Sequence, residues 1–200
     1  MMKLHYTAAS PFCRKVMVAA IECGIDDDIE IVTTNPHQSQ PGFVALNPFS
    51  KIPTLVLDDG TVLFESLLIC EYLNELAGGE QVLARPGPGC LRILRKHALG
   101  NGIMEASVLR RMESLRATDP DREKNLARQR AIMERALDQV ETVIDTFGDD
   151  MDIGNISIAV SLGYIDFRFS DDGWRERRPK LAKWYARVSN RKSLLQTPHS

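Results

Sequence analysis

The chain has 200 residues, 44% of them hydrophobic, which is enough for a sizeable buried core in one large domain or two small ones. No apolar run reaches the roughly 18 residues of a membrane span and residues 1–10 lack a secretory signal, so we expect a cytoplasmic protein without a membrane partner. The net charge of −2 is unevenly distributed: residues 1–78 contain 4 Lys and Arg against 10 Asp and Glu, and the remainder is basic. Because the basic residues of the remainder alternate with acidic ones, we expect no nucleic-acid partner.

The first thirty residues predict a strand, a helix and a second strand. Residues 3–6 have a short strand-like pattern, and Ser10 and Pro11 precede an apolar-periodic helix that Gly24 closes. The β-branched residues of 29–33 favour a second strand. These three elements together predict a βαβ unit.

Two short strands and a helix complete this first part. After a brief helical stretch at residues 42–46, the strands 54–57 and 61–64 flank Asp59-Gly60, a strong hairpin signal that makes them antiparallel neighbours. An amphipathic helix follows over residues 66–76. The predicted order is therefore β-α-β-α-β-β-α.

The rest of the chain predicts helices only. Residues 78–89 are rich in Gly and Pro and read as a linker, which divides the chain into a first domain of residues 1–77 and an all-helical domain of residues 90–200. The helical patterns of the second domain cover residues 91–116, 122–147, 153–168 and 180–188.

One helix of the second domain carries a clear start signal. Asp152 is well placed to cap it, with Asn155 as a weak capping-box partner. Met151 and Ile156 occupy the positions of a hydrophobic staple. We expect this apolar helix to form the core of the domain.

Ser10 lies where the first helix begins, and a helix N-terminus stabilises an anion through unpaired N–H groups and a partial positive charge. The Ser10 hydroxyl either caps the helix, which the local pattern favours, or donates a hydrogen bond to a bound thiolate. A hydrogen bond to a charged group contributes about 1.5 to 3 kcal/mol, which would lower a thiol pKa by roughly 1 to 2. The resulting thiolate would need no general base.

Cys13 follows Ser10 at the spacing of a redox motif whose first cysteine is replaced, which excludes a two-cysteine disulfide cycle there. We expect Cys13 to be a small buried side chain, with a mixed disulfide to a ligand as the alternative. Cys23, Cys70 and Cys90 are widely separated and form no CxxC pair. We therefore expect free thiols and no metal.

Two dipeptides beside the predicted strands are candidate ligand contacts. A cis bond at Ile52-Pro53 would turn the Ile52 backbone outward to pair with an extended peptide, although only about 5% of X-Pro bonds are cis. At the start of the next helix, Ser66 either caps the helix or binds a carboxylate, and Glu65 can accept from an ammonium group. Such a site suits a short peptide that carries a thiol, an amine and carboxylates.

Three segments, in this order and at this spacing, resemble the glutathione S-transferase family: SPFCRKV at 10–16, NPFSKIPTL at 47–55 and FESLLICEYL at 64–73. The resemblance covers the whole chain, since the GYIDFR ending at 163–168 is similar to that of many bacterial members. It implies a thioredoxin-like domain that binds glutathione, an all-helical second domain, and an electrophile between the two.

The resemblance also implies site residues. Ser10 matches the thiol-activating serine, with Cys13 as the alternative catalytic residue and Tyr6 as a less favoured hydroxyl donor. In family terms, Ile52 and a cis Pro53 hold the cysteinyl part of glutathione. The implied glutathione-binding residues are Phe12, Lys51, Ile52, Pro53, Glu65 and Ser66.

The activity implied is that of a glutathione transferase, an enzyme that activates the glutathione thiolate for attack on a small electrophilic substrate, with a role in detoxification. The alternatives are a glutathione-dependent thiol transferase or reductase that uses Cys13, and a non-catalytic binding protein of the same fold. Glutathione is then the co-substrate, and family membership implies a homodimer. His37 and Gln38 are weak ligand candidates, and Met104, Arg110 and Met112 could line the electrophile site.

Overall fold

A computed structural model describes residues 1–38, 41–84 and 86–200. Its first part contains a four-stranded sheet in the order β2-β1-β3-β4. Strand β1 pairs in parallel with β2 and antiparallel with β3, and β3 pairs antiparallel with β4, as the Asp59-Gly60 signal predicted. The strands are β1 (Met2–Tyr6), β2 (Ile29–Thr33), β3 (Thr54–Val56) and β4 (Val62–Phe64).

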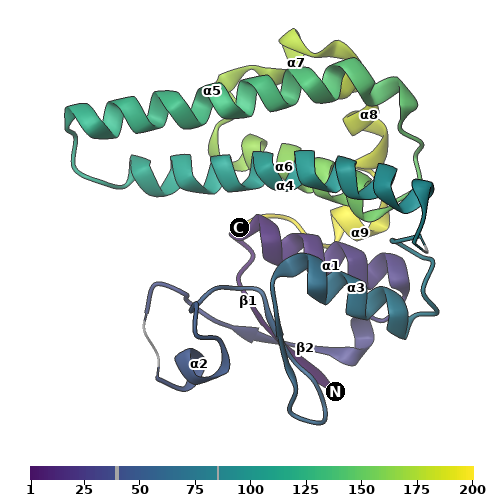
Figure 1. The fold of residues 1–200 in the computed structure, drawn as a ribbon. Coiled ribbons are helices and arrows are strands. Elements are labelled where there is room, and N and C mark those ends of the chain that lie inside the picture. Colours follow the sequence, from purple (N-terminus) through teal and green to yellow (C-terminus); the bar gives the residue numbers. More distant parts are fainter. Residues whose placement is uncertain (39–40, 85) are drawn as a thin grey trace.

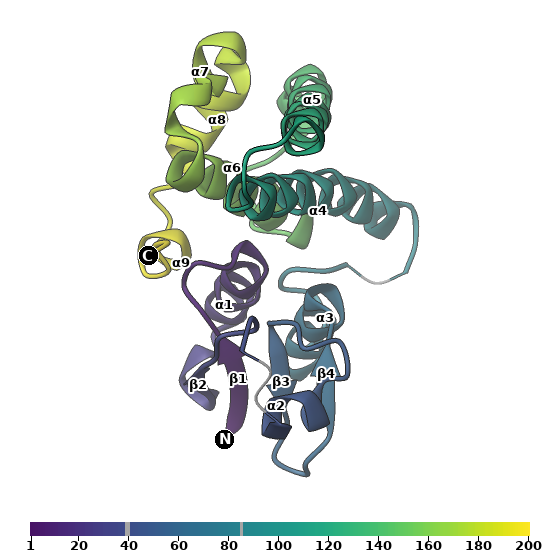
Figure 2. The same ribbon diagram turned by 90° about the vertical axis from the view of Figure 1, so that its left-hand side faces the viewer.

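Two helices of this part lie between the sheet and the helical domain (Figures 1 and 2). Helix α1 (Pro11–Cys23) begins at its cap Ser10 and ends at Gly24, whose φ of 69° only glycine adopts without cost. Helix α3 (Ser66–Leu76) packs beside α1. The short helix α2 (Pro41–Leu46) lies away from both (Figure 1). These elements form the predicted thioredoxin-like arrangement.

The second part is helical throughout its described residues. Helices α4 and α5 lie side by side, and α6 passes behind them (Figure 1). Helix α4 begins at Pro88, within the range predicted as linker, because proline is favoured in the first turn of a helix. The helices are α4 (Pro88–Ser114), α5 (Pro120–Val143), α6 (Ile153–Arg168), α7 (Trp174–Arg177), α8 (Pro179–Val188) and α9 (Lys192–Leu195), with 3-10 turns at Asp26–Asp28, Ile144–Thr146 and Ser170–Asp172.

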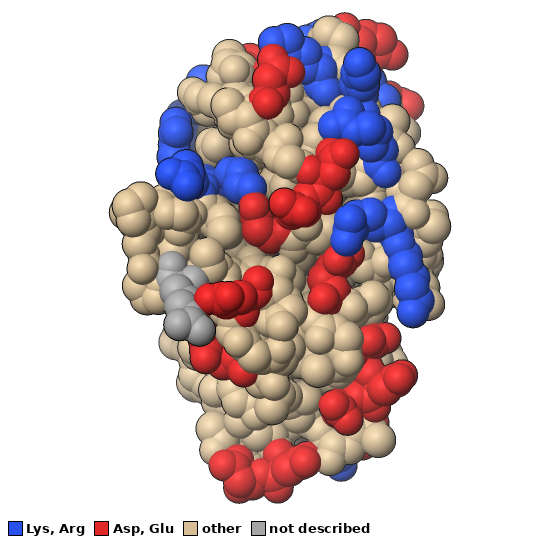
Figure 3. Space-filling view, turned by 90° about the vertical axis from the view of Figure 1, so that its right-hand side faces the viewer, with Lys and Arg blue, Asp and Glu red and all other residues tan. Residues whose placement is uncertain are grey.

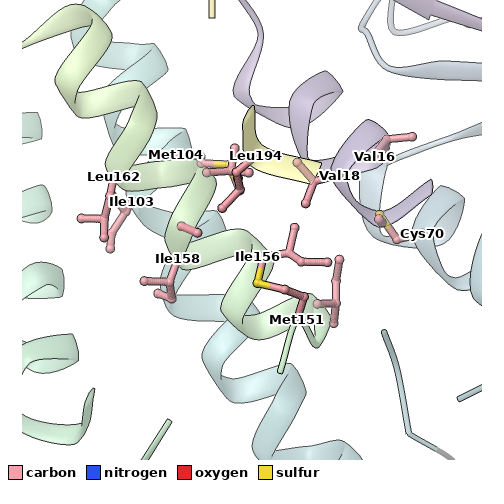
Figure 4. Close-up of a cluster of buried hydrophobic side chains, with 14 of the residues drawn as sticks. Val16, Val18, Cys70, Ile103, Met104, Met151, Ile156, Ile158, Leu162 and Leu194 are labelled. Atoms are coloured by element: carbon pink, nitrogen blue, oxygen red, sulfur yellow. The ribbon is translucent and has the colours of Figure 1, made fainter. Parts of the chain in front are cut away.

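Helix α6 is the centre of the core, because every residue from Ile153 to Ile165 is buried. Its neighbours come from both halves of the chain. Figure 4 shows Val18 of α1 and Leu194 of α9 beside Met104 of α4, close to the α6 side chains. Met104 is therefore a core residue with no exposed surface, which is the ordinary role of a methionine at helical spacing.

Asp152 caps α6 as predicted, since its carboxylate accepts from the Asn155 amide at 2.9 Å. The capping-box role of Asn155 is wrong. Its side-chain amide donates to the carbonyls of Gly148 (3.0 Å) and Asp150 (2.7 Å) and so fixes the preceding loop. The predicted staple is present in outline, because Met151 is buried in the core cluster together with Ile156.

Charge is divided between the two parts. On the face drawn in Figure 3, the charged side chains of the lower half are nearly all Asp and Glu, whereas most of the Lys and Arg lie on the upper half. Two arginines join the parts: Arg14 of α1 donates to the Leu194 carbonyl at 3.1 Å, and Arg191 pairs with Glu22 of α1 at 2.8 Å. No helix in the described ranges is both long and apolar enough to cross a membrane.

Candidate functional site

Strand register brings three separate segments to one end of the sheet. His5 of β1 is opposite Thr54 of β3, and Thr54 is opposite Phe64 of β4. The loop that leads from β1 to Ser10, the residues just before Thr54, and Glu65 just after Phe64 therefore meet at the same edge. Adjacent strands are about 4.8 Å apart, so three strands span about 10 Å, roughly the length of an extended tripeptide.

Ser10 is half-buried at the N-terminus of α1. Its hydroxyl oxygen accepts from the Cys13 amide at 3.3 Å, which makes Ser10 the helix cap that the sequence predicted. Capping uses a lone pair of the oxygen, and the hydroxyl hydrogen is left to donate to the neighbouring Cys13 sulfur or, after rotation about the C–O bond, to a ligand. One side chain can therefore cap the helix and donate to a ligand at the same time.

Cys13 lies one turn further along α1 and has no exposed surface. Burial raises the pKa of its thiol to about 12, and the hydrogen bonds offered by Ser10 and by the Thr7 backbone offset only part of that rise. Cys13 thus has the environment of an inert structural cysteine, as its pattern predicted. The cysteines Cys13, Cys23, Cys70 and Cys90 are all free thiols.

The loop before β3 presents backbone groups to the site. The Ile52-Pro53 peptide is cis, as the family resemblance implies. Ile52 is half-exposed, and its N–H and C=O have no hydrogen-bond partner among the described residues. An extended peptide could pair with both groups, in the way a strand is added to a sheet edge.

Asn47 holds this loop in place, a role that sequence reasoning missed. Its buried side-chain amide donates to the Lys51 carbonyl and to the Thr54 hydroxyl, both at 2.9 Å, while its oxygen accepts from the Phe49 amide at 3.0 Å. Three hydrogen bonds from one side chain thus fix the conformation of the residues on both sides of Ile52.

Glu65, and not Ser66, caps helix α3, so the suggestion that Ser66 caps it is wrong. The Glu65 carboxylate accepts from the Leu67 amide at 3.0 Å and from the Ser66 hydroxyl at 3.1 Å. Ser66 is instead the first residue of the helix and is 2% exposed. Glu65 remains exposed, and its carboxylate has lone pairs left for a ligand donor.

The loop before β3 and the connection from β4 to α3 each contain one residue with a strained backbone conformation. Glu65 (φ 81°) and Ser50 (φ 50°) are the described non-glycine residues with positive φ. Each such position costs of order 1 to 3 kcal/mol and is found most often at functional sites. Ser50 precedes the Ile52 loop and Glu65 opens α3, so both strained residues border the edge where the three segments meet.

The described residues contain no group of three or more His, Cys, Asp or Glu side chains placed to hold a metal ion.

Comparison with known proteins bears on the chemistry of the site. The model of the glutathione S-transferase N-terminal domain matches residues 9–76, and that of the C-terminal domain matches residues 123–187. An uncharacterized GST-like protein of Escherichia coli K12, YibF, is 32% identical over 199 residues, which are 98% of each chain. The chain belongs to the glutathione S-transferase family.

Solved structures of similar family members contain ligands. A glutathione transferase family member from Pseudomonas fluorescens Pf-5 with bound glutathione is 39% identical, covers both chains completely and has a TM-score of 0.93. The same family member with bound S-(propanoic acid)-glutathione gives a TM-score of 0.90. A glutathione S-transferase from Methylobacillus flagellatus KT with glutathione bound is 28% identical, with a TM-score of 0.91 over both full chains.

The other candidate residues of this glutathione S-transferase family member differ in how exposed they are. Phe12 is half-buried beside Ser10, and Lys51 is exposed on the loop before Ile52. Tyr6 is half-buried at the end of β1, and burial raises the pKa of its hydroxyl. His37 and Gln38 are exposed in the turn after β2, which begins beside Tyr6 at the same end of the sheet.

Sequence reasoning missed one cluster beside the site. The fully buried Lys15 ammonium of α1 lies 3.1 Å from His97 Nε2 and donates to Asn101 Oδ1 at 3.0 Å, so it connects the sheet domain to α4. Burial lowers the pKa of Lys15, while the Glu65 carboxylate acts to raise it. The only sequence signal was a charged residue on the apolar side of the predicted helix.

Proposed function

We propose that this glutathione S-transferase family member is an enzyme that binds glutathione at the sheet edge and transfers it to a small electrophile. The observation that carries the proposal is the Ser10 hydroxyl, which caps α1 with its oxygen and can turn its hydrogen from the Cys13 sulfur to a ligand. In this complex the glutathione thiol lies at the start of α1, the Ile52 backbone pairs with the cysteinyl residue, and Glu65 accepts from the glutamyl ammonium. Glutathione is bound in the similar structures from Pseudomonas fluorescens and Methylobacillus flagellatus, which supports glutathione as the ligand.

The chemical step needs no further catalytic group. The Ser10 hydroxyl donates to the sulfur and the helix N-terminus adds a partial positive charge, so the thiol loses its proton to solvent at neutral pH. The thiolate then forms a carbon–sulfur bond to the electrophile. In a substitution the leaving group departs with the bonding electron pair, and in an addition the carbanion takes a proton from water. The S-(propanoic acid)-glutathione bound by the Pseudomonas fluorescens relative is a thioether of the kind such a step produces.

A reductase that acts through Cys13 is less well supported. Burial raises the pKa of the Cys13 thiol to about 12, so the thiol stays protonated at pH 7. It also has no exposed surface through which a disulfide substrate could reach its sulfur. Replacing Cys13 with Ala should therefore leave conjugation intact, whereas loss of disulfide reduction in that variant would favour the alternative.

The direct test is a spectroscopic titration of glutathione on the protein. Thiolate absorbance is followed against pH with the protein in excess, and S-methylglutathione, which has no ionisable thiol, supplies the baseline. We expect the thiol pKa of bound glutathione to lie about 1 to 2 below that of free glutathione. An unchanged pKa at saturation would contradict the mechanism, and failure of glutathione to bind in calorimetry would favour a non-catalytic binding protein.

A further inference from the structure

A cavity of about 520 Å³ lies in the helical domain and is rich in arginine. Helix α4, the first half of α5 and the end of α6 contribute its walls. The lining residues are Arg110, Arg111, Ser114, Glu123, Leu126, Ala127, Arg130, Arg168 and Phe169. Four guanidinium groups around one small cavity produce a strong positive field, except where a carboxylate pairs with them.

Asp172 neutralises the arginines on one side of the cavity. Its carboxylate pairs with Arg110 through both oxygens and lies 3.6 Å from Arg130. Arg111 and Arg168, by contrast, form no ion pair with any described residue. The lining carboxylate of Glu123 is paired with Arg122. Two uncompensated cations therefore remain at the same cavity.

Arg168 is held in place by the Phe167 ring and by a hydrogen bond to the Tyr164 hydroxyl. Its guanidinium lies 3.9 Å from the centroid of the Phe167 ring, a cation–π contact that fixes the plane of the fork. Its Nε is buried and has no hydrogen-bond partner. Arg111 makes one long hydrogen bond, 3.5 Å to the Ser114 hydroxyl. A buried donor without an acceptor, such as the Arg168 Nε, is costly unless a ligand or water completes it, and Arg111 beside the same cavity has no counter-charge, so an anion would satisfy both.

The Tyr164 hydroxyl lies beside both cations. Burial raises the pKa of the Tyr164 hydroxyl, whereas the charge of Arg168, a side-chain hydrogen bond from Arg168 and the charge of Arg111 act to lower it. The Tyr164 ring is 5.4 Å from the His199 ring, and His199 Nδ1 donates to the Ala8 carbonyl at 2.9 Å.

Ala8 belongs to the loop between β1 and α1 that ends at Ser10, and the C-terminus lies beside the start of α1 (Figures 1 and 2). A continuous line of contacts therefore joins the unpaired arginines to the loop that presents the Ser10 hydroxyl.

We propose that Arg111 and Arg168 bind a carboxylate on the electrophile, so that the preferred substrates are small anionic electrophiles. This inference rests on the proposed transferase function, because it names the substrate class of the same site. The planar guanidinium fork matches a carboxylate with two parallel hydrogen bonds, and an uncharged electrophile would leave both cations without a counter-charge. The anionic end lies toward α4 and α6, and the reacting carbon faces the sulfur above Ser10.

The test compares 4-chloro-3-nitrobenzoate with its methyl ester, two electrophiles that react at the same carbon. For each, kcat/KM is divided by the rate of the uncatalysed reaction with glutathione, and the carboxylate-to-ester ratio is the readout. We expect a ratio above about tenfold in the wild type and a loss of about tenfold in Arg111→Gln and in Arg168→Gln. Arg128→Gln is the matched control, because Arg128 is exposed on α5 outside the cavity.

The same comparison can be made without catalysis. Calorimetry measures the Kd of the product conjugate, S-(4-carboxy-2-nitrophenyl)glutathione, and of its methyl ester for each variant. The carboxylate preference should appear in these Kd values, decrease at high salt and be reduced in both arginine variants.

A wild-type ratio near one, or equal losses for acid and ester in both variants, would overturn the inference. If neither electrophile is turned over, the transferase function fails, and the Kd ratio still decides whether the arginine pair binds a carboxylate.

Discussion

The Ser10 hydroxyl oxygen accepts the hydrogen bond of the Cys13 amide at 3.3 Å, while the Cys13 side chain is fully buried. The two residues of the motif therefore have separate roles. Ser10 caps the N-terminus of α1 with a hydroxyl that can also donate to a ligand, whereas the Cys13 side chain packs in the protein interior. This relationship makes the stability and the activity contributed by Ser10 separable by mutation.

Ser10→Ala removes both the cap and the hydroxyl donor. We expect the free energy of unfolding to fall by about 0.5 to 2 kcal/mol. The thiol pKa of bound glutathione should rise by about 1 to 2, and conjugation at pH 7 should slow roughly 10- to 100-fold. Ser10→Asp is the matched variant, because aspartate caps a helix equally well but offers no hydroxyl donor. It should keep the stability and lose the activity, whereas an active Ser10→Asp would argue against the role of the hydroxyl.

Glu65→Gln separates the cap of α3 from the charge of its side chain. The Gln side-chain oxygen can still accept from the Leu67 amide, so unfolding should change by less than about 1 kcal/mol. The Kd of glutathione should rise about tenfold, because a carboxylate–ammonium contact is lost. A glutathione analogue without the α-amino group should bind the two proteins equally in calorimetry. Glu75→Gln, at the other end of α3, is the control, and equal losses for both ligands would contradict the assignment.

His97 should make the protein sensitive to acid. Burial, and then the adjacent Lys15 ammonium, lower the pKa of His97 to about 4. Between that value and the unfolded value of about 6.5, the unfolded chain binds a proton that the native protein does not, so stability is lost as pH falls through this window. Wild-type protein should lose about 2 to 3 kcal/mol from this group between pH 7.5 and 4.5. Urea unfolding of His97→Gln should show a smaller loss over the same range, and parallel pH slopes would disprove the assignment.

Two glycines of α4 should respond in opposite ways to alanine. A Cβ at Gly100 would lie 2.5 Å from the Ser157 carbonyl carbon and 2.7 Å from the Ile158 amide, both in the α6 backbone. Gly100→Ala should therefore destabilise the protein by about 2 kcal/mol or more, despite better helix propensity. At Gly102 nothing lies within 4 Å, so Gly102→Ala should be neutral or stabilising by up to about 1 kcal/mol. Thermal unfolding of both variants checks the contrast, which would fail if their midpoints shifted together.

The amino-acid sequence determined the local features of this protein. The Ser10 cap, the Gly24 stop, the Asp59-Gly60 hairpin and the Asp152 cap were all predictable, because each depends on the chemistry of a few consecutive residues. The motif around Ile52 and Pro53 pointed to the family, although the residue that holds this loop, Asn47, was not recognised.

Tertiary structure decided how these pieces act together. Strand register brings Ser10, Ile52 and Glu65 to one edge, and the backbone of Glu65 makes it the helix cap in place of Ser66. Arg111 and Arg168, which form no ion pair with a described residue, come from different helices, and only the packing of these helices brings both to one cavity beside Tyr164. Such relationships depend on contacts between residues tens of positions apart, which local propensity does not encode, and on which charges packing leaves without a partner.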